Sequence, residues 1–70
     1  MFRLRLSRHA VIKARQRFRW DCSKTKAYFR QRFRMCDIPL GGRQVLDDGG
    51  VVWVVANDGF TVTIITLHLR

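Results

Sequence analysis

The spacing of apolar residues changes along the chain, and each spacing predicts a different element. Residues 2–6 alternate apolar and basic side chains, which is the period of a strand, although this stretch can instead lead into a helix. Ser7 is a favourable N-cap, so we expect a first helix from there to about Phe18. Its apolar seam consists of Val11, Ala14 and Phe18, with Ala10 beside it.

A second helical pattern follows the first and stops at a clear breaker. Asp21 or Ser23 can cap it, and its apolar residues predict a helix that runs to about Met35. These apolar residues are Phe29, Phe33 and Cys36, at positions i, i+4 and i+7. The segment "DIPLGG" at 37–42 ends the helix, because Pro39 and the glycine pair cannot continue it.

The remaining residues have the composition of strands. The stretches "RQVL", "VVWVVA" and "FTVTIITLHL" are rich in β-branched residues, and "DDGG" (47–50) and "NDG" (57–59) supply hairpin turns between them. In the last strand, simple alternation puts Thr61, Thr63, Ile65, Leu67 and Leu69 on one face, and Phe60, Val62, Ile64, Thr66 and His68 on the other. The predicted fold is α+β, with two N-terminal helices packed on a three- to four-stranded antiparallel sheet (ααβββ, with residues 2–6 as the optional leading strand).

Charge divides the chain into two unequal halves. Residues 1–35 hold 12 basic residues and one acid, whereas residues 36–70 hold two basic residues and four acids, so the net charge is +9. Such a concentration of lysine and arginine attracts polyanions, and nucleic acid is the leading partner. An anionic membrane surface or an acidic protein is the alternative.

Length and cysteine content indicate a small intracellular domain. We interpret residues 1–70 as one domain, with a basic helical half (1–36) and a β-meander half (37–70). Cys22 and Cys36 match no zinc-binding pattern, and we expect free, partly buried thiols rather than a disulfide. The longest apolar run, Val51–Ala56, is too short to span a bilayer, and the N-terminus lacks a signal peptide, so we expect a cytoplasmic protein without a membrane segment.

The basic helices carry the candidate binding residues. On the first helix His9, Lys13 and Arg17 lie at i, i+4 and i+8, on a stripe that begins opposite the apolar seam, so His9 should face solvent at the rim. The other candidate phosphate contacts are Arg8, Arg15 and Arg19 on the first helix and Arg30 and Arg34 on the second. We assign Phe29 and Phe33 to the core rather than to base stacking, because a domain this small needs its large apolar groups inside.

Other chemistry has few candidates in this sequence. It contains no glutamate, and its aspartates fall in turns or caps, so paired-carboxylate catalysis is excluded. No phosphate-binding glycine loop, serine triad or metal-ligand cluster can be assembled, and we predict no metal and no cofactor. Thr61 and Thr63 form a small hydroxyl patch that suits either phosphate contact or simple strand formation.

The stretch "SRHAVIKARQRF" resembles the opening helix of small bacterial and phage proteins that begin with a Ser-x-His-Ala helix. In that group, two helices precede a sheet that ends in a Val-Thr-hydrophobic strand, here "TVTIIT". The group belongs with the RelE-like and barnase-like endoribonucleases, many of them toxins of toxin–antitoxin systems. The resemblance implies that His9 transfers the proton, that Lys13 and Arg17 clamp the phosphate, and that Thr63 donates a hydrogen bond. Lys13 departs from the pattern, which expects an arginine there.

Three hypotheses follow from these observations. The first is a metal-independent, toxin-like endoribonuclease acting on free or ribosome-bound RNA, with catalytic His9, Arg17 and Thr63. The second is a non-catalytic nucleic-acid-binding or regulatory protein, phage-encoded for instance, that uses the basic helices for phosphate contacts. The third is a module that docks an acidic partner such as an antitoxin.

Overall fold

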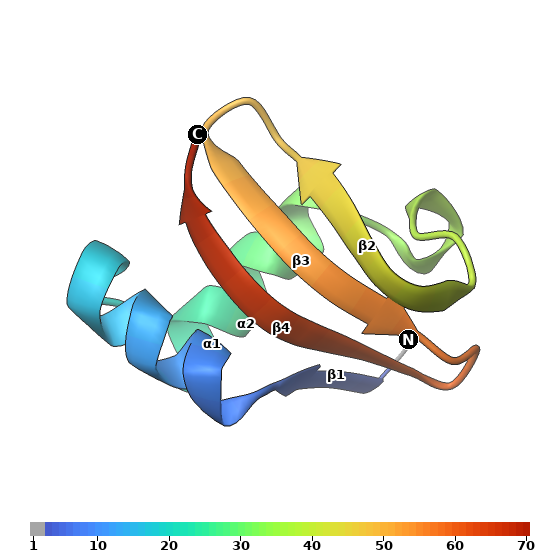
Figure 1. The fold of residues 1–70 in the computed structure, drawn as a ribbon, viewed down its shortest axis with the longest axis horizontal. Coiled ribbons are helices and arrows are strands. Elements are labelled where there is room, and N and C mark those ends of the chain that lie inside the picture. The colour runs from blue at the N-terminus through green and yellow to red at the C-terminus, as the bar shows by residue number, and fades with distance from the viewer. Residues whose placement is uncertain (1–2) are drawn as a thin grey trace.

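The computed structural model describes residues 3–70 as one mixed sheet with helices on one face. The elements are β1 (Arg3–Leu6), α1 (Arg8–Lys13), the π-helical turn η1 (Ala14–Phe18), α2 (Cys22–Arg32), the 3-10 turn η2 (Met35–Asp37), β2 (Gly41–Asp47), β3 (Val51–Asn57) and β4 (Thr61–Leu69). Figure 1 looks onto the open face of the sheet, with α2 behind it and α1 beside β4. The α+β class is confirmed, and the expected leading strand is present, although Phe2 lies outside the described residues.

The sequence predicted a fully antiparallel sheet, but the sheet of the structure is mixed. Its strand order is β1-β4-β3-β2, and β1 pairs in parallel with β4, so that Arg5 lies beside Thr63 and Leu6 beside Ile64. The three C-terminal strands form the expected antiparallel meander. Local sequence specifies the two hairpins, whereas the partner of β1 depends on how the helices return the chain to the sheet.

A bulge in β4 overturns the predicted division of its faces. Val55 pairs with Ile64 but Val54 pairs with Thr66, so β4 holds one extra residue, Ile65, at this point. An extra residue reverses the alternation that follows it. The polar residues of β4 therefore share the open face: Thr61, Thr63, Thr66 and His68. The buried residues Val62, Ile64 and Leu67 share the helix-covered face.

Both predicted helices form, with differences at their C-terminal ends. The first ends at Phe18 as expected, but its last five residues adopt a π turn, after which Arg19 takes a left-handed conformation (φ 58°). The second is capped by the Asp21 carboxylate, which accepts from the Lys24 N–H at 2.7 Å, and it ends at Arg32 rather than at Met35. Its expected seam is correspondingly shorter, since Cys36 lies exposed in η2.

Trp53 on β3 is the centre of the core. Its side chain is fully buried, which removes about 150–250 Å² from water and stabilises the fold by about 4–6 kcal/mol. Phe29 of α2 meets its ring edge-on, with ring centroids 5.0 Å apart. Phe29 is fully buried and Phe33 packs against it at 5.0 Å, so the assignment of these rings to the core is confirmed.

Both cysteines are free, as expected, but their predicted partial burial is wrong. Cys22 is the first residue of α2 and Cys36 lies in η2, and both are exposed. The helices bury other residues instead, because the contact face of α2 is taken by Thr25 and Phe29.

Candidate nucleic-acid interface

Ser7 fixes the start of α1 against the middle of β4. Its backbone N–H donates to the Ile64 carbonyl at 2.9 Å, and its hydroxyl donates to the Ile65 carbonyl at 2.6 Å. The same hydroxyl accepts from the Ala10 N–H at 3.0 Å, so the predicted N-cap is confirmed. A short polar side chain thus joins the helix terminus to the bulge residue Ile65, and it sets where the first turn of α1 lies.

His9 follows two residues after this anchor, on the exposed side of α1. Ala10 beside it is fully buried, which turns the neighbouring side chain toward solvent, as the sequence had predicted. Within residues 3–70, the imidazole has no hydrogen-bond or ion-pair partner. Nothing in the described chain therefore selects one orientation of the ring.

The segment that carries the expected stripe changes its helical geometry after Lys13. His9 is exposed, Lys13 is half-buried and Arg17 is exposed. His9 and Lys13 lie on α1, whereas Arg17 lies in the π turn η1, whose hydrogen bonds join residues five apart.

Thr63 lies on the open face of β4, one residue before the Ser7 contact. It is half-buried and lines a shallow hollow of about 380 Å³ at the end of the β3–β4 hairpin. No hydrogen bond joins Thr63 to His9 or to Arg17 in the part of the chain that the structure describes. The backbone thus brings the segments of His9 and Thr63 together, but their side chains form no preassembled pair.

All five aspartates are engaged away from α1 and η1. Three form ion pairs, between Arg32 and Asp48 (3.8 Å), Arg34 and Asp37 (4.0 Å), and Arg70 and Asp47 (3.2 Å). Asp21 caps α2, and Asp58 closes the β3–β4 turn. Consequently no cation on the first helix or directly after it has a carboxylate partner among the described residues: Arg8, Lys13, Arg15, Arg17 and Arg19.

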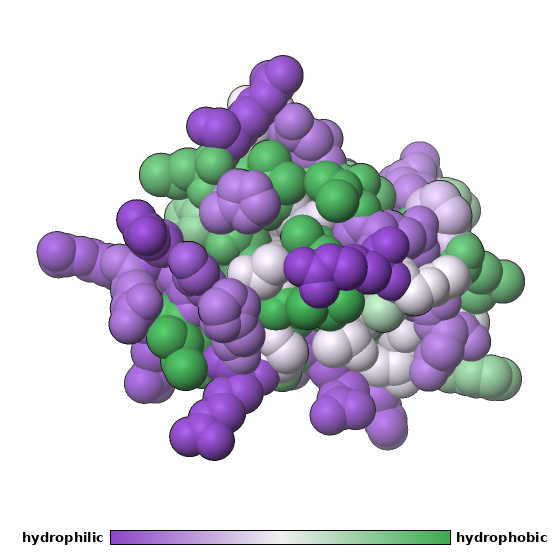
Figure 2. All heavy atoms as spheres, in the orientation of Figure 1, coloured by the Kyte–Doolittle hydropathy of each residue, from purple (hydrophilic) through white to green (hydrophobic). Residues whose placement is uncertain are grey.

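Figure 2 shows where hydrophilic side chains gather on this view of the molecule. They cover α1 and η1, at the left of the view, whereas hydrophobic, intermediate and hydrophilic side chains are mixed over the strands. Like charges one helical turn apart repel each other by about 0.2–0.5 kcal/mol per pair. We call this set of five cations (Arg8, Lys13, Arg15, Arg17 and Arg19) the cationic flank, and a bound polyanion would relieve its repulsion.

The arginines on α2 and directly after it differ in their surroundings from the cationic flank. The Arg32 guanidinium lies 4.1 Å from the centre of the Tyr28 ring as well as near Asp48. Arg34, a predicted phosphate contact that lies after the end of α2, is highly exposed but already pairs with Asp37. Arg30 is exposed on α2 and also takes part in a contact. These arginines are therefore less available for phosphate than those of the cationic flank.

Asp48 is the most enclosed acid and has a structural role. Burial raises the pKa of its carboxyl, but hydrogen bonds from the N–H groups of Val51 and Gly50 and from the Trp53 indole, together with the Arg32 charge, lower the pKa below its usual value. At neutral pH the carboxylate is therefore ionised and joins α2, the β2–β3 turn and the core tryptophan.

Sequence reasoning missed two cations on the open face, Arg3 and Arg5. Both are exposed on β1, and the register places them beside Thr61 and Thr63. Their alternation with Leu4 and Leu6 was visible, but the identity of the neighbouring strand was not. Only the parallel pairing of β1 with β4 shows that these arginines lie beside Thr61 and Thr63.

The described part of the chain contains neither a metal-ligand cluster nor a membrane-spanning helix. Among residues 3–70, no three His, Cys, Asp or Glu side chains gather closely enough to hold a metal ion. No helix in the same range is long and apolar enough to cross a membrane.

Comparisons of the chain with protein-family models, with curated proteins and with solved structures find no match.

Proposed function

We propose that this protein binds RNA through the cationic flank and cleaves it without a metal ion. The observation that carries the proposal is that five cations lie on the first helix or directly after it and none has a carboxylate partner within residues 3–70. Arginine forks match phosphate oxygens, and partial neutralisation would stabilise both the complex and the helix. The element order, in which two helices precede a sheet ending in the Val62-Thr63-Ile64 strand, supports the resemblance to RelE-like endoribonucleases.

The chemistry proposed for His9 is transfer of the 2′-hydroxyl proton. The freed 2′ oxygen attacks phosphorus, the bond to the 5′ oxygen breaks, and the products are a 2′,3′-cyclic phosphate and a 5′-hydroxyl. Arg17 stabilises the charge that grows on the phosphoryl oxygens, and Thr63 donates a hydrogen bond from the sheet. Water protonates the leaving oxygen in this scheme.

A second candidate, RNA binding without cleavage, is favoured by one observation. A general base is normally held in place by a further hydrogen bond, and the His9 imidazole has none within the described chain. In this alternative the imidazole is one more polar contact to RNA. An acidic antitoxin-like protein would compete with RNA for the same cations in either case.

His9→Ala distinguishes the two candidates. If the protein is a ribonuclease, His9→Ala should abolish cleavage of single-stranded RNA while its affinity, measured by filter binding, changes less than about threefold. His68→Ala is the matched control, because His68 is the other exposed histidine and lies on β4 rather than on the first helix, so its loss should leave cleavage unchanged.

The wild-type protein gives the decisive outcomes. Binding without cleavage, for RNAs of every sequence and structure tried and in the presence of ribosomes, would refute catalysis and leave the second candidate. Failure to bind any RNA at low salt would refute both.

A further inference from the structure

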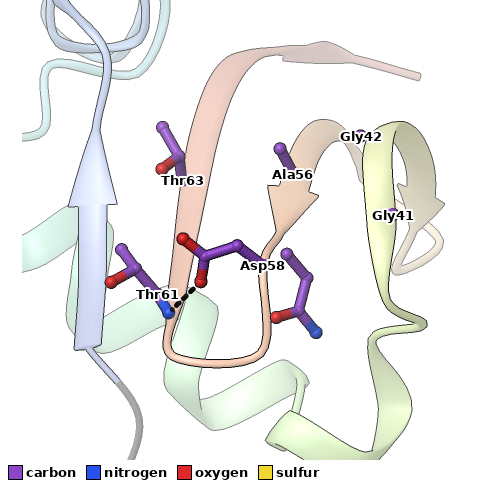
Figure 3. A pocket seen from close by; sticks show the side chains of 7 residues that line it. Gly41, Gly42, Ala56, Asp58, Thr61 and Thr63 are labelled. Carbon is purple, nitrogen blue, oxygen red and sulfur yellow. Dashed lines mark hydrogen bonds between the residues drawn. The ribbon is translucent and has the colours of Figure 1, made fainter.

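The hollow on the open face has the form of a small-molecule site. Figure 3 shows that β2, β3, β4 and the turn between β3 and β4 surround it. Its lining includes Gly41, Gly42, Ala56, Asp58, Thr61 and Thr63. Its volume, about 380 Å³, lies at the lower end of the range for small-ligand pockets (about 300–1,000 Å³), which is adequate for one nucleotide unit.

One side of the hollow is flat because it lacks side chains. β2 has an irregular register between Gly41 and Gln44, and a Cβ added to Gly42 would meet no atom within 4 Å. Ala56, on β3, adds only a methyl group. A planar ring can therefore approach the backbone here more closely than elsewhere on the sheet.

The other side of the hollow carries hydrogen-bonding groups that the protein does not use. The Oδ1 atom of Asp58 accepts from the N–H groups of Thr61 (2.7 Å) and Phe60 (2.9 Å). The second oxygen makes no hydrogen bond within residues 3–70, and Figure 3 shows it directed toward Thr63. The hydroxyls of Thr61 and Thr63 are likewise without a partner in the described chain.

A negative charge lines the hollow, and two positive charges lie on the strand next to its threonines. Hydrogen bonds from the N–H groups of Thr61 and Phe60 lower the pKa of Asp58, so its carboxylate is ionised at neutral pH. Arg3 and Arg5, on the neighbouring strand, lie beside Thr61 and Thr63 in register. A ligand that fits must therefore present hydrogen-bond donors toward Asp58 and a negative group toward β1.

We propose that this hollow binds one nucleotide of the RNA chain, with the exocyclic amino group of its base on Asp58 and its phosphate on Arg5 and Thr63. The assignment rests on the proposed RNA binding and adds to it a site with a base preference. A carboxylate only accepts hydrogen bonds. Adenine, cytosine and guanine carry an amino group with two donors, whereas uracil offers only one ring N–H, so these three bases should bind better than uracil.

The test is an amide chemical-shift titration of the full chain with AMP, CMP, GMP, UMP and ribose 5-phosphate. We expect shifts at Gly42, Ala56, Thr61 and Thr63, with amino-bearing nucleotides binding about fivefold more tightly than UMP, the equivalent of one hydrogen bond of about 1 kcal/mol. Ribose 5-phosphate should bind more weakly than any of the four nucleotides.

Two variants and one control sharpen the titration. Asp58→Asn keeps an oxygen for the turn but replaces the free acceptor with a donor, so it should reverse the preference toward the O4 carbonyl of UMP. Gly42→Leu should fill the hollow and abolish the shifts. Gly50→Leu is the control, because Gly50 lies in the β2–β3 turn, does not line the hollow and, like Gly42, has no positive φ. The melting temperatures of both variants show whether each is folded.

Each outcome bears on the hollow separately from the cationic flank. Equal affinities for ribose 5-phosphate and the nucleotides would overturn base binding, as would an unchanged rank order in Asp58→Asn or unchanged shifts in folded Gly42→Leu. The absence of shifts in the wild-type protein would overturn the hollow as a site even if long RNA binds. Loss of long-RNA binding in a variant of the cationic flank, with the nucleotide shifts intact, would support the hollow as a distinct site.

Discussion

Two variants with equal charge but different geometry test whether the cationic flank is an interface. The first replaces Arg8, Arg15 and Arg17 with glutamine, and the second replaces Arg32, Arg34 and Arg70 with glutamine. Both lower the net charge from +9 to +6. The first removes exposed guanidinium groups without carboxylate partners in the described chain, whereas the second removes those that already pair with aspartates.

The expected difference follows from counterion release. For single-stranded nucleic acid, each phosphate contact contributes about −0.7 to the slope of log K against log salt, so loss of three contacts should make the slope shallower by about 2. If the first variant and the wild type bind equally at 1 M salt, where the electrostatic contribution vanishes, the variant should bind about 100-fold more weakly than the wild type at about 0.1 M salt. The second variant should keep the wild-type slope within about 0.5, because its guanidinium groups are partly neutralised before RNA arrives.

The assay is a filter-binding titration at several salt concentrations, with single-stranded RNA carrying 2′-O-methyl groups so that cleavage does not interfere. Thermal unfolding of each variant provides the control for folding. This control matters most for the second variant, because Arg32 also contacts Asp48 and the ring of Tyr28.

Equal slopes for the two variants would refute the reasoning. Such a result would mean that RNA responds to net charge alone, as a diffuse polyelectrolyte effect, and that the unpaired state of the first-helix cations has no consequence for binding. A larger loss in the second variant, with both proteins folded, would place the interface on α2 and the C-terminal strand instead.

Two stability predictions follow from the hydrogen bonds around α1 and the core. Asp48→Asn removes the acceptor of the Trp53 indole N–H (3.2 Å) and the charge facing Arg32, and should cost about 1–3 kcal/mol in urea unfolding at pH 7. Because folding lowers the pKa of Asp48, the stability that its carboxylate contributes is complete above the usual value of 3.8 and is lost as pH falls through the folded value. If the wild type and Asp48→Asn still differed equally in their free energy of unfolding at pH 2, this account would be contradicted. Ser7→Ala should cost about 1–2 kcal/mol of unfolding free energy, because it removes the N-cap of α1 and the hydrogen bond to the Ile65 carbonyl of β4. The control Ser23→Ala should be neutral, because Ser23 is exposed and makes no side-chain hydrogen bond in the described chain. Equal costs for the two variants would argue against a stabilising role of the Ser7 hydroxyl.

Features governed by neighbouring residues could be predicted from the sequence. Ser7 and Asp21 act as N-caps because a hydroxyl or carboxylate at that position reaches the N–H group three residues later. The two hairpin turns follow from Asp, Asn and Gly, since these residues tolerate the backbone angles of a tight turn. The exposure of His9 followed from its place opposite the apolar seam.

Features that depend on distant contacts could not be predicted. The parallel pairing of β1 with β4 requires knowing where two helices return the chain. The π turn at Ala14–Phe18 precedes a stack of aromatic rings, in which Trp20 lies 4.6 Å from both Phe18 and Tyr28. No local pattern distinguishes such a turn from a further α turn, so the sequence predicted a continuous α-helix to Phe18.

The bulge at Ile65 connects stability to the proposed function. Without an extra residue, Leu67 would share the open face with Thr63, and Thr66 would point into the core beside Trp53. The bulge buries Leu67 and leaves a row of polar side chains on the open face, next to Arg3 and Arg5. Its carbonyl also accepts from the Ser7 hydroxyl, which places the start of α1 against the middle of β4. An RNA chain held by the cationic flank would therefore meet hydroxyls and guanidinium groups on its way to the hollow, whereas a regular β4 would present it with exposed leucine.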